Sequence, residues 1–313
     1  MITVHMMGNI GNQMFIYAMA RSLQLRTGQK LTVDLGGLKR RYYTSNYKLD
    51  CFDISQDINY DLNQLGFIRR SYYKISTFIY RIQHYYYRRK NGYTSPPEWL
   101  FRWWLKRGCY YNTGHSFFDS SSPLKKDINV YGYFQSEKYF KDYKDVIKRE
   151  FQVKAPVSDK DKTLISQMQS CNSVAVSIRA NKAPENPKFN DNIILGFFDK
   201  DYYFRGMEEI TKRVDNPVFY IFADDLSIVK TEYDFPYPVI YVTPDDSATG
   251  IRLMTKCKHF VIANSTFSWW GVYLAENEDK IVVMPDRWDR SGPSREDIYF
   301  GNPIRLSVNY LTE

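Results

Sequence analysis

The sequence predicts an α/β protein with two domains. Its 313 residues exceed the usual size of one domain and fall short of three. The opening residues show the pattern of a strand, a glycine-containing turn, a helix and a second strand. The second half alternates short apolar runs with helical patterns, which is typical of a parallel sheet covered on both faces.

The first expected element is a strand in the alternating run at 2–7, followed by a tight turn from Gly8 to Gln13. From Gln13 onward the apolar positions recur with a helical period. Gly28 stands where a glycine commonly ends a helix, just before the next expected strand at 31–35. These elements form a βαβ unit.

The rest of the N-terminal half shows two further features, a basic and aromatic segment at 65–110 and a short apolar run at 129–134. The polar stretch from Val153 to Asp161 contains one proline and suits a linker. We therefore expect an N-terminal domain at 1–156 and a C-terminal domain at 157–313.

In the C-terminal domain, apolar runs of strand length lie at 174–178, 218–223, 238–242, 259–263 and 280–284. Helical patterns lie between them at 202–214, 250–257 and 267–275. Ligands of such sheets bind beyond the carboxyl ends of the strands, where the chain connections diverge. The candidate motifs of this domain all lie at the carboxyl end of an apolar run.

The positive charge of the chain is concentrated in one segment. The formal net charge is +8, which implies an anionic partner, and residues 65–110 hold ten Lys or Arg against one acid, Glu98. The same segment is rich in Tyr and Trp. Three interpretations stay open: two helices that pack their aromatic side chains inward beneath a solvated basic face, a surface that docks on a membrane, or, least favoured, a platform for nucleic acid.

No stretch has the roughly 20 apolar residues that cross a bilayer, and the first residues lack the features of a secretory signal. The cysteines lie far apart, without the paired spacing of zinc sites, at Cys51, Cys109, Cys171 and Cys257. We expect free thiols in a reducing compartment. The expected location is the cytoplasm; the membrane-docking interpretation of 65–110 would add peripheral association with the inner face of the cytoplasmic membrane.

Two candidate anion-binding groups follow strands of the C-terminal domain. Arg179 comes directly after the run at 174–178, and a guanidinium there can grip a diphosphate with paired hydrogen bonds. After the run at 259–263, one of Asn264, Ser265 and Thr266 can cap the next helix, whose free N–H groups then face a phosphate. The alternatives are a salt-bridge arginine and an ordinary cap. Together the two groups form a candidate diphosphate clamp.

Asp224 and Asp225 end the run at 218–223. Neighbouring side chains of an extended chain point to opposite faces, so this pair does not easily chelate one ion. Capping of the next helix is the favoured interpretation, and a contact with a nucleotide or with Arg179 is the alternative. No two of the four histidines are spaced as metal ligands, so the sequence predicts no metal site.

The opening turn lacks the third glycine of the dinucleotide-binding fingerprint, which disfavours a dehydrogenase. It carries Asn12 and Gln13 instead, whose amides are available to a ligand.

At four separated signatures, in the same order, the chain resembles the family 11 glycosyltransferases, which are mostly α-1,2-fucosyltransferases. Gly8 to Phe15 is similar to the opening glycine turn of that family, with Asn9 in place of its second glycine. The other signatures are the mid-chain Gly132 to Phe140, the Phe-Ser-Asp-Asp-like Phe222 to Asp225, and the most specific run, Leu253 to Gly271.

The resemblance implies a GT-B architecture of two facing Rossmann-like domains, here with a helical basic and aromatic insertion in the N-terminal half. It implies an inverting enzyme that transfers L-fucose from GDP-fucose to the 2-hydroxyl of a β-galactoside in a surface glycan or oligosaccharide. The donor is a co-substrate, and neither a cofactor nor a metal is expected. The acceptor is expected to be a glycan or a lipid-linked oligosaccharide.

The resemblance also implies roles for individual residues. Arg179 matches an arginine that contacts the diphosphate, and Asn12 matches an asparagine near the reacting sugar, so these two are the expected catalytic residues. Gly11 and Gln13 are expected on the acceptor side. The expected donor-binding residues are Ser177, Asp224, Asp225, Asn264, Ser265, Thr266, Phe267 and Ser268.

One departure from the family pattern lies beside Arg179. The family usually has His-x-Arg-Arg-Gly-Asp, whereas this chain has Ser177 to Lys182, in which Ala180 replaces the second arginine and Asn181-Lys182 brings no carboxylate. The general base is open among acidic residues such as Asp191 and Asp199. The alternative functions are a transferase of another nucleotide-sugar in polysaccharide synthesis, and a noncatalytic protein that binds nucleic acid or a membrane.

Overall fold

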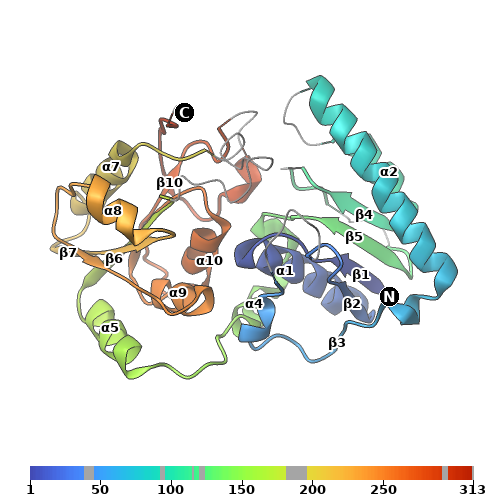
Figure 1. The fold of residues 1–313 in the computed structure, drawn as a ribbon, viewed down its shortest axis with the longest axis horizontal. Coiled ribbons are helices and arrows are strands. Elements are labelled where there is room, and N and C mark those ends of the chain that lie inside the picture. Colours follow the sequence, from blue (N-terminus) through green and yellow to red (C-terminus); the bar gives the residue numbers. More distant parts are fainter. Residues whose placement is uncertain are drawn as a thin grey trace. The chain divides into compact units, whose positions relative to one another are not determined.

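A computed structural model describes residues 1–38, 46–91, 96–114, 116–119, 124–180, 196–290 and 295–311. The chain divides into two compact units, each a layered α/β structure (Figure 1). Unit 1 consists of Met1–Phe151 with Arg295–Phe300, and unit 2 of Gln152–Ser294 with Gly301–Glu313. The domain boundary expected after residue 156 lies five residues from the boundary after Phe151. The return of Arg295–Phe300 to unit 1 was not expected.

Unit 1 is built on five parallel strands in the order β3-β2-β1-β5-β4. The strands are β1 (Ile2–His5), β2 (Leu31–Asp34), β3 (Ile58–Asn59), β4 (Cys109–Asn112) and β5 (Ile128–Gly132). Because side chains alternate along a strand, Ile2 and Val4 of β1 point to one face and Thr3 points to the other. All three are buried, so both faces of this sheet are covered.

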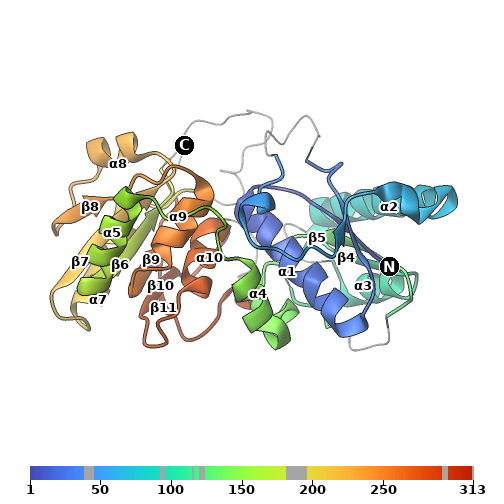
Figure 2. The same cartoon turned by 90° about the horizontal axis from the view of Figure 1, so that it is seen from below.

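The helices of unit 1 are α1 (Ile10–Thr27), α2 (Phe67–Asn91), α3 (Glu98–Leu105) and α4 (Lys144–Glu150). The helices α1 and α2 lie on opposite faces of the sheet (Figure 2). At the edge strand β4, Phe101 and Trp104 of α3 contact Tyr110 and Tyr111, with ring centres 5.1 and 5.2 Å apart. Short 3₁₀ helices complete the unit: η1 (Leu49–Cys51), η2 (Leu62–Leu65), η3 (Glu137–Tyr139), η4 (Lys141–Tyr143) and η5 (Glu296–Ile298).

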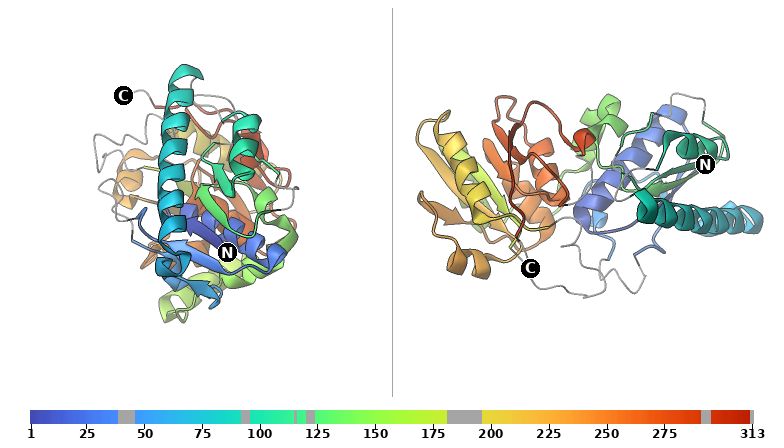
Figure 3. Two further views of the ribbon diagram at one scale, coloured as in Figure 1. Left: turned by 90° about the vertical axis from the view of Figure 1, so that its right-hand side faces the viewer. Right: turned by 90° about the horizontal axis from the view of Figure 1, so that it is seen from above.

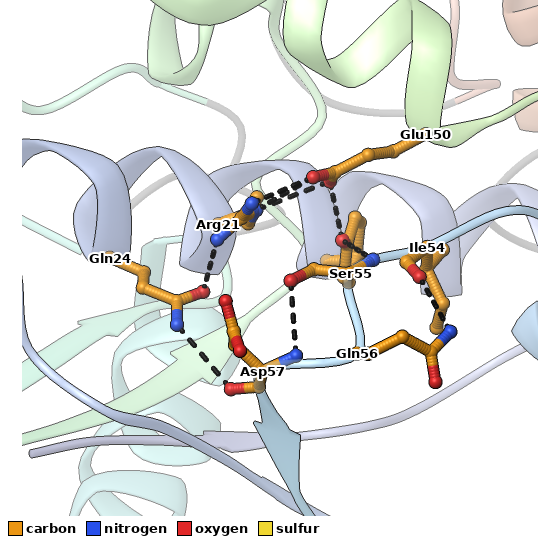
Figure 4. A network of polar contacts seen from close by, with 8 residues as sticks. Arg21, Gln24, Ile54, Ser55, Gln56, Asp57 and Glu150 are labelled. Carbon is orange, nitrogen blue, oxygen red and sulfur yellow. Dashed lines mark hydrogen bonds and ion pairs between the residues drawn. The ribbon is translucent and has the colours of Figure 1, made fainter.

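A buried carboxylate ties α1 to the surrounding chain of unit 1 (Figure 4). Glu150, at the end of α4, accepts hydrogen bonds from the Tyr17 hydroxyl at 2.5 Å and from Nη2 of Arg21 at 2.8 Å. Arg21 also donates to Gln24 at 2.8 Å, and the Tyr17 hydroxyl accepts from the backbone N–H of Ser55 at 3.1 Å. The network therefore fixes α1 against α4 and against the segment that leads into β3.

Unit 2 has six parallel strands in the order β11-β10-β9-β6-β7-β8. They are β6 (Asn172–Ile178), β7 (Pro217–Ala223), β8 (Val239–Tyr241), β9 (His259–Ile262), β10 (Val282–Pro285) and β11 (Ile304–Leu306). The helices are α5 (Asp159–Ser170), α7 (Lys200–Thr211), α8 (Leu226–Glu232), α9 (Ser247–Met254) and α10 (Thr266–Leu274).

The two faces of the sheet in unit 2 are covered by different helices (Figure 1). Val174, Val176 and Ile178 share one buried cluster with Tyr203 and Met207 of α7. The alternate position Ser177 contacts α10 on the other face. There α9 and α10 pack closely, because Gly271 has no side chain. A Cβ atom at this position would lie only 2.2 Å from Sδ of Met254 in α9.

The five strands and three helices expected in unit 2 are present, with ends shifted by a few residues. Two expectations were wrong in detail. The first helix begins at Ile10 and not at Gln13, because Gly8, with φ of 71°, completes the turn by itself. The expected linker ends early, because the Ser158 side chain caps α5, which already contains Asp161. At its other end α1 stops where expected, with Gly28 in the left-handed conformation.

Among the described residues, no helix is both long enough and apolar enough to cross a membrane. The four cysteines are free thiols, two of them buried and two half-buried.

Candidate functional site

The strand order of unit 2 creates a point where the chain connections diverge, between β6 and β9. From β6 the chain moves outward through β7 and β8, and from β9 it moves outward in the other direction through β10 and β11. Ligands of parallel sheets bind beyond the carboxyl ends of the strands at such a point. Ser177 of β6 pairs with Ile262 of β9. Arg179 and Asn264 each follow two residues later, so both parts of the candidate diphosphate clamp lie at this edge.

Arg179 is half-buried directly beyond β6. Its backbone N–H donates to the Tyr203 hydroxyl at 3.3 Å, and its guanidinium carbon lies 5.3 Å from the centre of the Phe197 ring. Burial raises the pKa of Tyr203, so this hydroxyl stays neutral and accepts the bond from the backbone. These contacts hold the backbone and the guanidinium of Arg179 in place at the strand end.

The two adjacent carboxylates have separate tasks. Asp224 accepts hydrogen bonds from the backbone N–H of Ala180 at 2.7 Å and from that of Asp225 at 3.1 Å. Asp225 caps α8 by accepting from the N–H groups of Ser227 and Ile228. The hydrogen bond from the Ser227 hydroxyl is the main cause that lowers the pKa of Asp225. Asp224 therefore fixes the chain next to Arg179, while Asp225 serves the helix.

The helix α10 begins just after β9, and β9 is the neighbour of β6, the strand that Arg179 follows. Ser265 occupies the N-cap position, but its side chain makes no capping hydrogen bond. Ser265, Thr266 and Phe267 are half-buried, whereas Asn264 is buried and donates to the Trp288 carbonyl at 2.9 Å. A helix start without a side-chain cap offers backbone N–H groups and the positive end of the helix dipole to an anion.

Ser177 and Ser268 are buried and lie side by side, with their hydroxyl oxygens 2.6 Å apart. Their hydrogen bond joins β6 to the first turn of α10. The structure thus brings these two expected donor-binding residues together, and their contact links the strand that precedes Arg179 to the helix that follows Ser265.

In unit 1 the expected acceptor-side residues belong to the first turn of α1. Gln13 is buried, donates to the carbonyls of Gly8 and Asn46 at 2.9 and 3.0 Å, and accepts from the N–H of Lys48 at 2.9 Å. Gly11 is buried as well, and Asn12 is half-buried. Gln13 thus holds the chain around the glycine turn, so its amide is not available to a ligand, whereas Asn12 is the less buried of the two.

Gln135 connects Asn12 with a residue far along the chain. Its Nε2 donates to Oδ1 of Asn12 at 2.8 Å, and its Oε1 accepts from Nη1 of Arg295. Arg295 is 7% exposed and belongs to the segment that returns to unit 1. Gln135 and Arg295 of this hydrogen-bonded row also line a small pocket. Its lining residues are Gly114, Ser116, Phe134, Gln135, Ser136, Tyr139 and Arg295.

The backbone before Gln135 is in an unusual conformation. Phe134 is buried with φ of 52°, a region in which a non-glycine residue costs on the order of 1–2 kcal/mol. Its carbonyl accepts from the N–H of Ser136 at 2.8 Å, which closes a tight turn around Gln135. Such a strained residue beside a polar pocket is typical of sites in which geometry serves ligand binding.

Several residues of this site were not identified from the sequence. The signature 132–140 marked Gln135 and Tyr139 without indicating a role for either. Arg295 gave no signal, because its contact with Gln135 spans 160 positions. Of the two acidic residues considered as the general base, Asp199 caps α7 by accepting from the N–H of Asp201 at 3.0 Å. Asp191, together with Asn181 and Lys182, lies outside the described residues.

Within the part of the chain that the structure describes, no group of three or more His, Cys, Asp or Glu side chains is arranged to hold a metal ion. Arg179 and the start of α10 are two positive groups at the strand ends of unit 2.

Comparison with known proteins places these features in a family. Residues 1–304 match the family model described as glycosyl transferase family 11. A similar curated protein is the O-antigen biosynthesis glycosyltransferase WbnK of Escherichia coli, 28% identical over 299 residues, with 90% of this chain and 92% of the relative covered. An alpha-1,2-colitosyltransferase of Escherichia coli is 24% identical over 299 residues, with 92% of each chain covered.

Two solved structures share the fold. The crystal structure of fucosyltransferase NodZ from Bradyrhizobium matches with a TM-score of 0.50 at 15% identity, over 86% of this chain and 91% of that one. NodZ alpha-1,6-fucosyltransferase co-crystallized with GDP matches with a TM-score of 0.50 at 16% identity, over 88% and 92% of the two chains. The fold class is GT-B, with one parallel α/β sheet in each unit.

Proposed function

The chain belongs to glycosyl transferase family 11, and from this premise we propose that it transfers L-fucose from GDP-fucose to the 2-hydroxyl of a β-galactoside. The acceptor is part of a surface glycan or an oligosaccharide, as the O-antigen role of one relative suggests. One observation carries the proposal. Arg179 and the start of α10, which has no side-chain cap, follow the neighbouring strands β6 and β9, where the chain connections of unit 2 diverge.

The chemistry needs positive groups at a leaving diphosphate. As the bond between the anomeric carbon and the β-phosphate oxygen breaks, negative charge grows on the diphosphate, which leaves as part of GDP. The acceptor oxygen bonds to the opposite face of the carbon, and a general base, which we leave unassigned, takes its proton. Arg179, the hydroxyls of Ser265 and Thr266, and the N–H groups of α10 stabilise that charge. These groups take the role that a metal has in other transferases, so we propose a metal-independent reaction with inversion from β to α.

In this proposal the acceptor binds to residues of unit 1. Asn12 orients the reacting sugar or the acceptor, and Gln135 and Arg295 hold the Asn12 amide in one orientation. Hydrogen-bonding side chains such as these, with Tyr139 in the pocket wall, suit a polyhydroxylated ligand.

Arg179→Ala is the direct test. Loss of one such donor costs about 2.7–4 kcal/mol in the transition state, so transfer should fall by at least about a hundredfold. The matched control is Arg213→Ala, which removes an exposed arginine of the same unit that pairs with Glu209. Equal melting temperatures of the variants establish that both are folded. Near-normal transfer by Arg179→Ala would refute the assignment.

The alternative to GDP-fucose is a donor that carries another sugar. It is favoured by the similarity to an alpha-1,2-colitosyltransferase and by Ala180 in place of the usual second arginine. Release of free nucleotide should be measured with GDP-fucose, GDP-mannose, UDP-galactose and a colitosyl donor in parallel. The expected result is turnover of GDP-fucose in the presence of a β-galactoside, with no product when the acceptor's 2-hydroxyl is replaced by hydrogen.

A further inference from the structure

The orientation of α2 in unit 1 is fixed by hydrogen bonds along one of its faces. The hydroxyl of Tyr111 in β4 lies 2.7 Å from the Ser76 hydroxyl and 3.0 Å from the Thr77 hydroxyl. Three residues further, the buried Tyr80 hydroxyl lies 3.0 Å from that of Thr113. Because these contacts prevent the helix from turning about its axis, the opposite face of α2 must point away from the sheet.

That opposite face is apolar. We call its seven residues, which are spaced by three, four and seven positions, the outer stripe: Ile68, Ile75, Phe78, Ile79, Ile82, Tyr85 and Tyr86. Ile75 is 58% exposed, Phe78 60% and Ile82 53%. Eleven of the fourteen large apolar side chains exposed in the described residues lie between 65 and 110. In the left view of Figure 3, α2 runs along the front of unit 1.

Cations line one border of the outer stripe. Arg70, Lys74, Arg81 and Arg88 follow one another at steps of four, seven and seven residues, which places them in one row along the helix. The helix contains no Asp or Glu. Arg88 also suits the negative end of the helix dipole, but Lys74 and Arg81 lie in the middle of α2, where the dipole gives them no such role.

The other border of the outer stripe is formed by α3. The Tyr72 hydroxyl donates to the Arg107 carbonyl at 3.2 Å, and Trp104 donates to the Gln83 side chain at 3.0 Å. On α3 itself Trp99 is 68% exposed and Trp103 39% exposed. The inward packing considered from the sequence therefore accounts for buried rings such as Trp104, but not for the outer stripe or these two tryptophans.

We propose that α2 and α3 dock unit 1 on an anionic lipid surface, with α2 lying in the plane of the membrane. The outer stripe enters the boundary between headgroups and acyl chains, and the row from Arg70 to Arg88 contacts the headgroup phosphates. Exposed Trp99 and Trp103 suit the same boundary, because indole rings prefer the interface between water and lipid.

The charge of α2 favours a lipid surface over a second copy of the chain. Two α2 helices packed through their outer stripes would bring cations together with no carboxylate on either helix to pair with them. Glu98 of α3 is already bonded to Arg102. A stripe of isoleucines also suits acyl chains better than bases, since single-stranded nucleic acid binds by stacking on aromatic rings. Lys74 and Arg81 exclude a transmembrane path for α2.

The test is flotation of the full-length protein with vesicles of phosphatidylcholine alone or with about one third phosphatidylglycerol. Lys74→Gln/Arg81→Gln/Arg88→Gln should weaken binding to the anionic vesicles by about a hundredfold, since each cation near such a surface contributes about fivefold. Ile75→Gln/Phe78→Gln/Ile82→Gln should abolish stable binding to the vesicles. The variant should stay folded, because these three side chains are already exposed to water. The matched control, Lys154→Gln/Lys162→Gln/Lys212→Gln, removes three exposed lysines from unit 2 and should bind as the unaltered protein does.

Brominated lipids add a positional readout. Of the six tryptophans, Trp99 is the most exposed, so vesicle binding should quench tryptophan fluorescence, and Trp99→Phe should remove most of that quenching. No binding to anionic vesicles at low salt would overturn the proposal. So would salt-sensitive binding to single-stranded nucleic acid in place of vesicles, or a dimer in solution that the Ile75→Gln/Phe78→Gln/Ile82→Gln variant dissolves. None of these readouts depends on the donor or on sugar transfer.

Discussion

The side-chain carboxamide of Gln135 accepts a hydrogen bond from Arg295, a residue 160 positions later in the chain. Its other end donates to Asn12. One side chain therefore couples the glycine turn of α1, the strained turn after β5 and the segment that returns to unit 1.

Gln135→Ala should reduce sugar transfer while leaving GDP binding unchanged. The change removes both hydrogen bonds and frees the Asn12 amide to rotate, so a loss of about tenfold to a hundredfold in kcat/KM for the acceptor is expected. Calorimetry with GDP should give the unaltered Kd, because the diphosphate site proposed above lies in unit 2. An equal loss of GDP affinity would contradict the role assigned to Gln135.

Asp224→Ala should impair transfer more than Asp225→Ala does. Asp224 holds the N–H of Ala180, directly after Arg179, whereas Asp225 caps α8. Asp224→Asn keeps one oxygen as an acceptor and should recover most of the lost activity. The comparison requires steady-state transfer rates and melting temperatures of all three variants. If Asp225→Ala were the more impaired variant at equal stability, the positioning role of Asp224 would be wrong.

Glu150→Ala should lower the free energy of unfolding by about 3–5 kcal/mol, because it leaves the largely buried Arg21 guanidinium without its carboxylate. Denaturant titration measures this. Replacing both partners, in Arg21→Met/Glu150→Leu, should cost less than Glu150→Ala alone, since no charge stays buried. Glu98→Ala, which removes an exposed partner of Arg102, serves as the control and should cost less than about 1 kcal/mol.

Stability should fall in mild acid because of His84. Burial, aided by the charge of Arg88, lowers the pKa of His84 from 6.5 to about 4. Between these values the unfolded chain binds a proton that the folded chain does not, so the free energy of unfolding decreases as the pH falls from 6.5 to 4, by up to roughly 3 kcal/mol.

The measurement for His84 is urea unfolding at pH 7, 5.5 and 4.5 for the unaltered protein and His84→Gln. The variant should be the less pH-dependent of the two. A difference between them that stays constant over this range would show that His84 does not titrate as expected.

The sequence indicated unit 2 more fully than unit 1, for physical reasons. Strands buried on both faces are continuous apolar runs, which made β6, β7 and β9 recognisable. Arg179 and the turn 264–266 could be found because they directly follow such runs. In unit 1 the run at 2–7 predicted β1 although Thr3 is a buried polar residue, but β3 and β4 were not expected. The strand β3 has only two residues, too few to show a period.

The finer arrangement of the site was beyond reach of the sequence. Whether Ser177 faces a ligand or another serine depends on which helix covers that face of the sheet. Asp224 and Asp225 are chemically equal neighbours, and only the backbone conformation decides that one caps α8 and the other holds Ala180. Arg295 gave no local signal because its role arises from a contact made after the whole chain has folded.

The return of 295–300 to unit 1 has a consequence for how the protein matures during translation. A ribosome moving at 5–20 residues per second needs on the order of ten seconds to proceed from Phe151 to Arg295. Throughout that interval the emerging N-terminal half lacks the guanidinium that anchors Gln135. Prematurely terminated chains therefore lack the part of the pocket wall that Arg295 forms, and the hydrogen bond between Arg295 and Gln135 arises only in the nearly complete polypeptide.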